Sequence, residues 1–339
     1  MNQMEKQKIK QVYNLALFCF DSISNVQNDI TNFEKLPHNQ VIKLLSDFLQ
    51  SEFSTNFYND FMNNLYQGEE VKLYFNQAEV EALEFQISEL IRQKKNYKIS
   101  EAIYQKEYKK LRINLLRAKK HDQNESYTLA PQNKLPGKIF LDMQENIEDS
   151  YTILHEGIHR MYLEANPKDY YLDELPSIWF EWKLYHYCIR NEKYKAETIN
   201  YFRKNLEFIK NSALSFIMCN IIRNIYVSHN EISKRTIWEN IMEIKSSNLR
   251  KNLKKEFQEI YWIDTSMINV DIKMYANYLQ AYYYGYYLSQ NPNVEETLES
   301  IKKEVYHNEN SLQRQIIKTM KNTEMVESFK KELKRIQEN

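Results

Sequence analysis

The chain has 339 residues, and its 46 Lys and Arg balance its 46 Asp and Glu, so the formal net charge is zero. A balanced charge gives no general attraction to nucleic acid or to an anionic membrane, and we expect neither as a partner. The three cysteines are odd in number and widely separated, which predicts no disulfide framework and favours a reducing, cytoplasmic compartment. No apolar run reaches the length of a membrane span, and the oligomeric state stays open.

The chain has four glycines and six prolines, and this scarcity of helix breakers predicts a mainly α fold. Apolar spacing predicts helices over 7–23, 39–66 (one helix or two), 77–92, 100–119, 147–164, 173–191, 213–226, 232–245, 271–289, 294–307 and 312–335. Two short segments, 127–129 and 138–143, are typical of strands that could pair through the loop between them.

The stretch 121–137 is polar and contains Pro131, Pro136 and Gly137, so it is the best candidate boundary. We expect a helical N-terminal lobe over 1–120 and a second lobe over 121–339, with a small sheet between them. One continuous domain is the alternative.

A short motif in the second lobe carries chemistry: His155-Glu156-Gly157-Ile158-His159. Residues four apart share one face of a helix, so the two imidazoles can bind one metal ion. Two imidazoles and a carboxylate suit zinc best, and Glu156 can act as general base on a zinc-activated water. The structural alternative is an exposed helix that happens to carry two histidines. The apolar residues around the motif place it on a half-buried helix and favour one zinc site.

Either of two glutamates could be the third zinc ligand. A histidine ligand six residues after the motif is excluded, because that position is Ala165. Glu174 and Glu181 are seven residues apart and share one helix face. One of them could bind zinc while the other holds a histidine ligand by a hydrogen bond.

Tyrosines crowd the segment 282–287, and Gly285 lies among them. Glycine inside a helix costs about 1 kcal/mol against alanine, so we expect a reason such as the close approach of a backbone or a substrate. Tyr283 and Tyr286 share a face, and a phenol beside zinc can stabilise an oxyanion. A tyrosine stripe in the core is the alternative.

Three blocks of the sequence resemble the thimet oligopeptidase and oligoendopeptidase F family of zinc metallopeptidases. They are the segment 137–144 with the motif helix after it, the residues Glu174-Leu175-Pro176-Ser177 with Glu181-Trp182, and the tyrosine-rich segment 282–289. The resemblance implies two helical lobes around a catalytic cleft with a gluzincin-type site. It also implies Glu174 as the third ligand, Glu181 as its support and catalytic Tyr283 and Tyr286. The chain departs from the family in its small size, in a shorter gap between His159 and Glu174, and in the position of Gly157.

We therefore predict a zinc endopeptidase that acts on short peptides. An extended substrate could pair with the strand that contains Ile139, Phe140 and Leu141, and Tyr278 is a further candidate contact. A protein that keeps the fold and the metal but binds peptides without turnover is the main alternative. An aminopeptidase or carboxypeptidase is a third reading.

Overall fold

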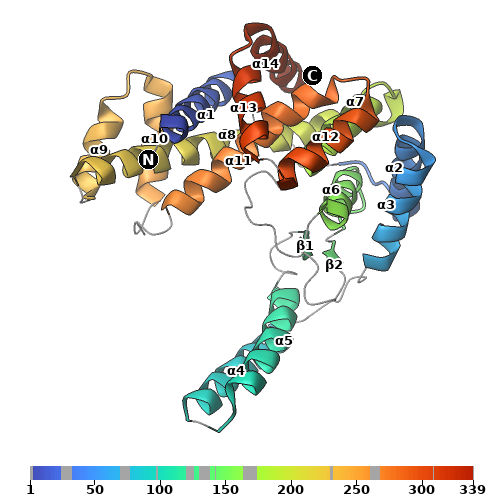
Figure 1. Cartoon of the computed structure of the whole chain (residues 1–339), viewed down its shortest axis with the longest axis vertical. Coiled ribbons are helices and arrows are strands. Elements are labelled where there is room, and N and C mark those ends of the chain that lie inside the picture. The colour runs from blue at the N-terminus through green and yellow to red at the C-terminus, as the bar shows by residue number, and fades with distance from the viewer. Residues whose placement is uncertain are drawn as a thin grey trace.

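The computed structural model describes residues 3–23, 33–68, 77–96, 98–119, 126–129, 138–141, 143–162, 174–229, 232–259, 268–307 and 309–338. The described part is mainly helical, as predicted (Figure 1). Its helices are α1 (Gln3–Ser22), α2 (His38–Glu52), α3 (Thr55–Gly68), α4 (Gln77–Lys95), α5 (Glu101–Lys119), α6 (Glu148–Tyr162), α7 (Glu174–Cys188), α8 (Glu192–His229), α9 (Lys234–Met242), α10 (Ser247–Glu259), α11 (Ile268–Ser289), α12 (Val294–His307), α13 (Glu309–Met320) and α14 (Thr323–Glu338). Among these helices none has both the length and the apolar character needed to cross a membrane.

Two short strands precede the helix that carries the motif. β1 (Tyr127–Leu129) and β2 (Lys138–Phe140) pair antiparallel, with Thr128 opposite Ile139. Both are three residues long, so β2 covers only the first half of the segment 138–143. β1 and β2 both contact α6, which places this small sheet beside the motif helix.

The central helix of the body is α7, which packs against α6, α8, α11 and α12. Every residue from Leu175 to Tyr185 is buried, and a helix without a polar face is typical of a core position. Pro176 lies in its first turn, where proline is tolerated. A Cβ at Gly285 of α11 would lie 3.3 Å from the backbone nitrogen of Trp179, so the close backbone approach expected at this glycine is confirmed.

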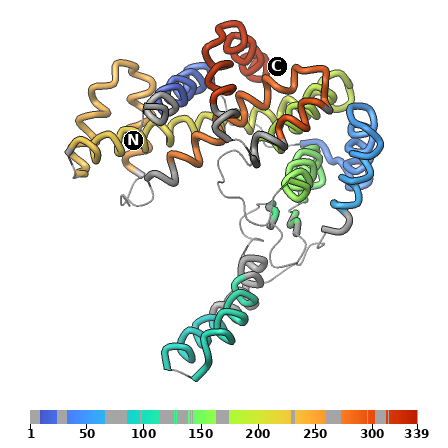
Figure 2. Tube along the Cα trace, in the orientation of Figure 1, coloured from blue at the N-terminus to red at the C-terminus, as the bar shows by residue number. Residues whose placement is uncertain are grey.

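One hydrophobic cluster includes residues from both sides of the candidate boundary, from Val12 in α1 to Ile336 in α14. Figure 2 shows α1 and α14 in the same helical body, although they lie at opposite ends of the chain. Phe18 stacks on Phe329, and Gln337 Nε2 donates a hydrogen bond to the carbonyl oxygen of Ser22. The first helix therefore packs with the last one and not with α4 and α5.

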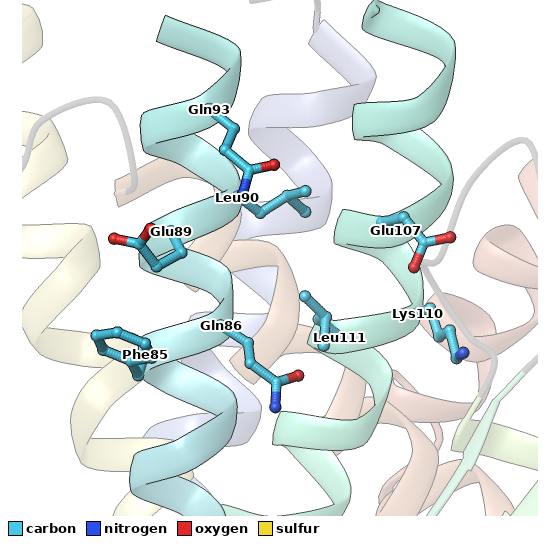
Figure 3. Close-up of a pocket in the computed structure, with 8 residues that line it drawn as sticks. All are labelled: Phe85, Gln86, Glu89, Leu90, Gln93, Glu107, Lys110 and Leu111. Carbon is cyan, nitrogen blue, oxygen red and sulfur yellow. The ribbon is translucent and has the colours of Figure 1, made fainter. Parts of the chain in front are cut away.

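Helices α4 and α5 form a hairpin that extends away from the body in Figure 1. Leu90 of α4 and Leu111 of α5 lie between the two helices (Figure 3), beside a cavity of about 430 Å³. Near the turn, Lys94 forms an ion pair with Glu101 at 3.0 Å. The Phe85 side chain is 67% exposed on this hairpin.

Gly157 of the motif helix lies against α3. A Cβ at this position would lie 2.6 Å from a ring carbon of Phe61, a side chain that is fully buried. This contact gives a physical reason for glycine at position 157.

We expect Gly157→Ala to destabilise the protein by about 1–2 kcal/mol, because the cost of forcing a methyl group into a packed core exceeds alanine's helix preference. Urea unfolding followed by circular dichroism measures the change. Phe61→Leu provides the control: in a double-mutant cycle the smaller side chain should recover part of the loss. Full additivity of the two single effects would contradict the steric explanation.

Candidate metal centre

The loop before α6 is fixed by the first turn of that helix. Asp149, which is buried, accepts hydrogen bonds from the backbone nitrogens of Gln144 at 2.7 Å and Glu145 at 2.8 Å. Ser177 of α7 donates a hydrogen bond to the carbonyl oxygen of His155 at 3.0 Å. The motif helix is thus held at its N-terminal end by the segment after β2 and at the motif itself by α7.

His155, His159 and Glu174 meet at one point. The Nε2 atoms of the two histidines are 2.9 Å apart, and Glu174 Oε2 lies 3.2 Å from the first and 3.5 Å from the second. All three side chains offer an atom that can bind a metal, and these atoms lie within 4.8 Å of one another. Among the described residues this is the single group of histidine, cysteine or acidic side chains with such a spacing.

Glu181 lies on the other side of His155. Its Oε1 atom is 2.6 Å from Nδ1 of His155, and the residue is 4% exposed. A neutral imidazole that donates its Nδ1 hydrogen to a carboxylate has a lone pair at Nε2, the form that binds a metal. The structure thus brings Glu174 to the three-residue cluster and places Glu181 behind the first histidine.

The charges of the cluster favour a cation. Burial lowers the pKa of His155, but hydrogen bonds to Glu174 and Glu181 outweigh it and hold that pKa well above its usual value. Burial raises the pKa of Glu174, and hydrogen bonds to His155 and His159 outweigh this effect and lower it. Two facing imidazole nitrogens and a carboxylate oxygen need a positive charge between them, so this donor set fits a zinc ion.

Glu156 points to the side of α6 that faces β1. The residue is 7% exposed, and its Oε2 atom accepts a hydrogen bond from the Thr128 hydroxyl at 2.7 Å. The same hydroxyl lies 2.9 Å from the carbonyl oxygen of Glu156. A polar cavity of about 370 Å³ opens beside it, lined by side chains of α6, α7 and α8 that include Glu156, Glu181 and Asn205. A water molecule in this cavity can reach the carboxylate.

The tyrosines near the cluster differ from the pair expected from the sequence. The hydroxyl of Tyr286 bonds to Ser328 of α14, and the buried ring of Tyr283 packs edge-on against Phe329. Tyr278 instead lies at the cluster, with its hydroxyl 3.4 Å from Glu174 Oε1. One turn later, burial raises the pKa of Tyr282, and the Glu181 and Glu174 carboxylates nearby raise it further. Tyr278 and Tyr282 lie on the face of α11 that is turned to the cluster. The tyrosines that follow lie on another face, which α13 and α14 cover.

The candidate substrate strand is only partly available. The side chain of Ile139 is buried in the core, so only the backbone of this residue is left to meet a substrate, as strand pairing requires. Phe140 ends β2 opposite Tyr127, and Leu141 follows the strand, partly buried against the core. Any pairing with a peptide would therefore use the backbone of this segment.

No local pattern predicts Thr128 or Ser177 as a hydrogen-bond partner of the motif, since threonine in a strand and serine in the first turn of a helix are both common. Their contacts join residues that are 28 and 22 positions apart. Only the packing of β1 and α7 on α6 reveals them.

In comparisons with known proteins, no protein-family model, no curated protein sequence and no solved structure matches the chain.

Proposed function

We propose that this chain is a zinc-dependent peptidase that hydrolyses internal bonds of short peptides. The observation that carries the proposal is the convergence of His155 Nε2, His159 Nε2 and Glu174 Oε2, with the buried Glu156 carboxylate on the same helix. The opposite side of His155 is occupied by Glu181, which supports a metal-binding form of the ring.

His155, His159 and Glu174 would hold the zinc ion, which when bound lowers the pKa of a water molecule and polarises a substrate carbonyl. Glu156 accepts the proton of the attacking water and returns it to the leaving nitrogen. Glu181 keeps the His155 ring in one orientation through its Nδ1 hydrogen bond. Tyr278, whose hydroxyl lies beside Glu174, replaces Tyr283 and Tyr286 as our candidate donor to the substrate oxygen.

The three sequence blocks and the cluster of His155, His159 and Glu174 are the basis on which we propose kinship with the thimet oligopeptidase and oligoendopeptidase F family, and with it a catalytic cleft between two helical lobes.

The proposal is tested by digesting a library of short peptides with zinc-loaded protein and identifying the products by mass spectrometry. We expect internal cuts that stop when a chelator removes zinc and resume when zinc is restored. Cuts confined to either end would instead select an aminopeptidase or carboxypeptidase. A zinc-loaded protein that binds peptides but produces no fragments would contradict the proposal and select the peptide-binding alternative.

Thr128 provides a separate test of the role of Glu156. We expect Thr128→Val to lower kcat by about 10- to 100-fold with little change in KM, because the carboxylate loses a charge-assisted hydrogen bond at 2.7 Å. Thr128→Ser keeps the hydroxyl and should retain most of the activity. Steady-state kinetics of the two variants measure the difference. Equal kcat values for Val and Ser at this position would show that the hydrogen bond from Thr128 to Glu156 does not contribute to catalysis.

A further inference from the structure

Arg160 follows His159 directly and is a buried cation. The residue is 8% exposed, yet its Nε and Nη1 atoms have no hydrogen-bond partner. No carboxylate among the described residues forms an ion pair with it. Leaving a charged group buried and unpaired is expensive, so this guanidinium is unusual unless an anion joins it.

A second buried cation shows the ordinary arrangement. Lys183 of α7 is also 8% exposed, but its Nζ atom lies 3.6 Å from a carboxylate oxygen of Glu52. The two residues therefore match in charge and burial, but among the described residues only Lys183 has an internal counter-charge.

The position of Arg160 ties it to the proposed site. Arg160 lies four residues after Glu156, as His159 lies four residues after His155, so the two pairs form neighbouring stripes of α6. Side chains at this spacing have Cβ atoms about 5–6 Å apart. An extended peptide rises about 3.4 Å per residue, so a group bound by Arg160 lies within about two residues of the bond that Glu156 acts on.

We propose that Arg160 binds a carboxylate of the peptide substrate, supplied either by its C-terminus or by an Asp or Glu side chain near the cleaved bond. The guanidinium offers two parallel N–H donors, which match the two oxygens of a carboxylate. A carboxylate would supply the counter-charge that no described residue provides and, on either edge of the guanidinium, an acceptor for one of the two nitrogens that lack a partner. This inference rests on the proposed peptidase function for the identity of the ligand, while the unpaired guanidinium is independent of it.

The first test measures the stability of the protein without substrate. We expect Arg160→Met to raise the urea midpoint of unfolding, because it removes an unpaired buried charge, and Lys183→Met to lower it, because it leaves Glu52 with one cation fewer. A structural role for Arg160 predicts the opposite sign, so a lower midpoint for Arg160→Met would overturn the proposal.

The second test measures peptide binding to zinc-loaded Glu156→Gln protein by calorimetry and does not depend on turnover. Each peptide is compared with its C-terminal amide and with its Asp→Asn and Glu→Gln forms. We expect one of these changes to weaken binding by about 10- to 100-fold, and the change that does so identifies the source of the carboxylate. Adding Arg160→Met should abolish that difference, whereas Lys183→Met should preserve it.

Equal binding of all peptide forms to the protein with Arg160 intact would overturn the inference, whether or not the Arg160 variant folds. Because binding is measured apart from cleavage, a protein that selects carboxylates but cuts nothing would refute only the peptidase function.

Discussion

Replacing Glu156 by Gln lowers kcat by about 10²- to 10⁴-fold and leaves zinc content unchanged, because the amide has the same shape but cannot accept the proton of the attacking water. Glu156 is not one of the three residues that meet at the proposed metal position, and its carboxylate lies on the neighbouring stripe of α6. The Thr128 hydroxyl can still bond to the amide oxygen, so we expect the fold to remain intact. Zinc analysis, circular dichroism and peptide cleavage measure the three quantities.

Glu145→Gln is the matched control for this variant. It makes the same change of charge at an exposed side chain eleven residues earlier, before α6 begins. We expect it to cleave peptides at the rate of the original protein. A Glu156→Gln protein that cleaves peptides at the same rate as this control would show that Glu156 is not the general base.

Glu174→Gln and Glu181→Gln should weaken zinc binding to different extents. Changing the hydrogen-bond partner of a metal ligand costs about 10- to 100-fold in metal affinity, and the Gln amide oxygen is an uncharged, weaker acceptor than the carboxylate, so we expect a loss of that size for Glu181→Gln. We expect a loss of more than about 100-fold for Glu174→Gln, because Glu174 Oε2 is itself one of the three converging atoms. The difference follows from position, since Glu181 contacts Nδ1 of His155 and Glu174 approaches Nε2.

Competition with a zinc-sensitive dye measures both affinities on one scale. His186→Gln serves as a control, since this half-buried histidine bonds to Ser289 and Gln290 and not to the cluster. A weaker zinc affinity in Glu181→Gln than in Glu174→Gln would contradict the assignment and exchange the roles of the two glutamates.

The local pattern of the sequence was enough to predict most helices, because their apolar spacing is regular and few breakers interrupt them. Two boundaries differ for local reasons. The predicted helix 312–335 is divided at Asn322, whose side chain accepts hydrogen bonds from the backbone nitrogens of Glu324 and Met325 and begins α14. The segment 213–226 belongs to α8, a helix of 38 residues. Apolar spacing does not predict helix α10, because charged and other polar residues dominate its sequence.

The candidate site shows where local pattern stops being informative. Helical spacing alone aligns His155 with His159, but it cannot choose between Glu174 and Glu181, which share a face of α7. That choice depends on how α7 packs on α6. The tyrosines show the same limit: the pair expected from the resemblance is covered by α13 and α14, and the face with Tyr278 meets Glu174.

The most direct test of the metal site is anomalous X-ray diffraction from crystals of the zinc-loaded protein. We predict one zinc ion bound by Nε2 of His155, Nε2 of His159 and the carboxylate of Glu174, with Glu181 on the far side of His155. A zinc ion bound by Glu181, or no zinc at the two histidines, would contradict the account.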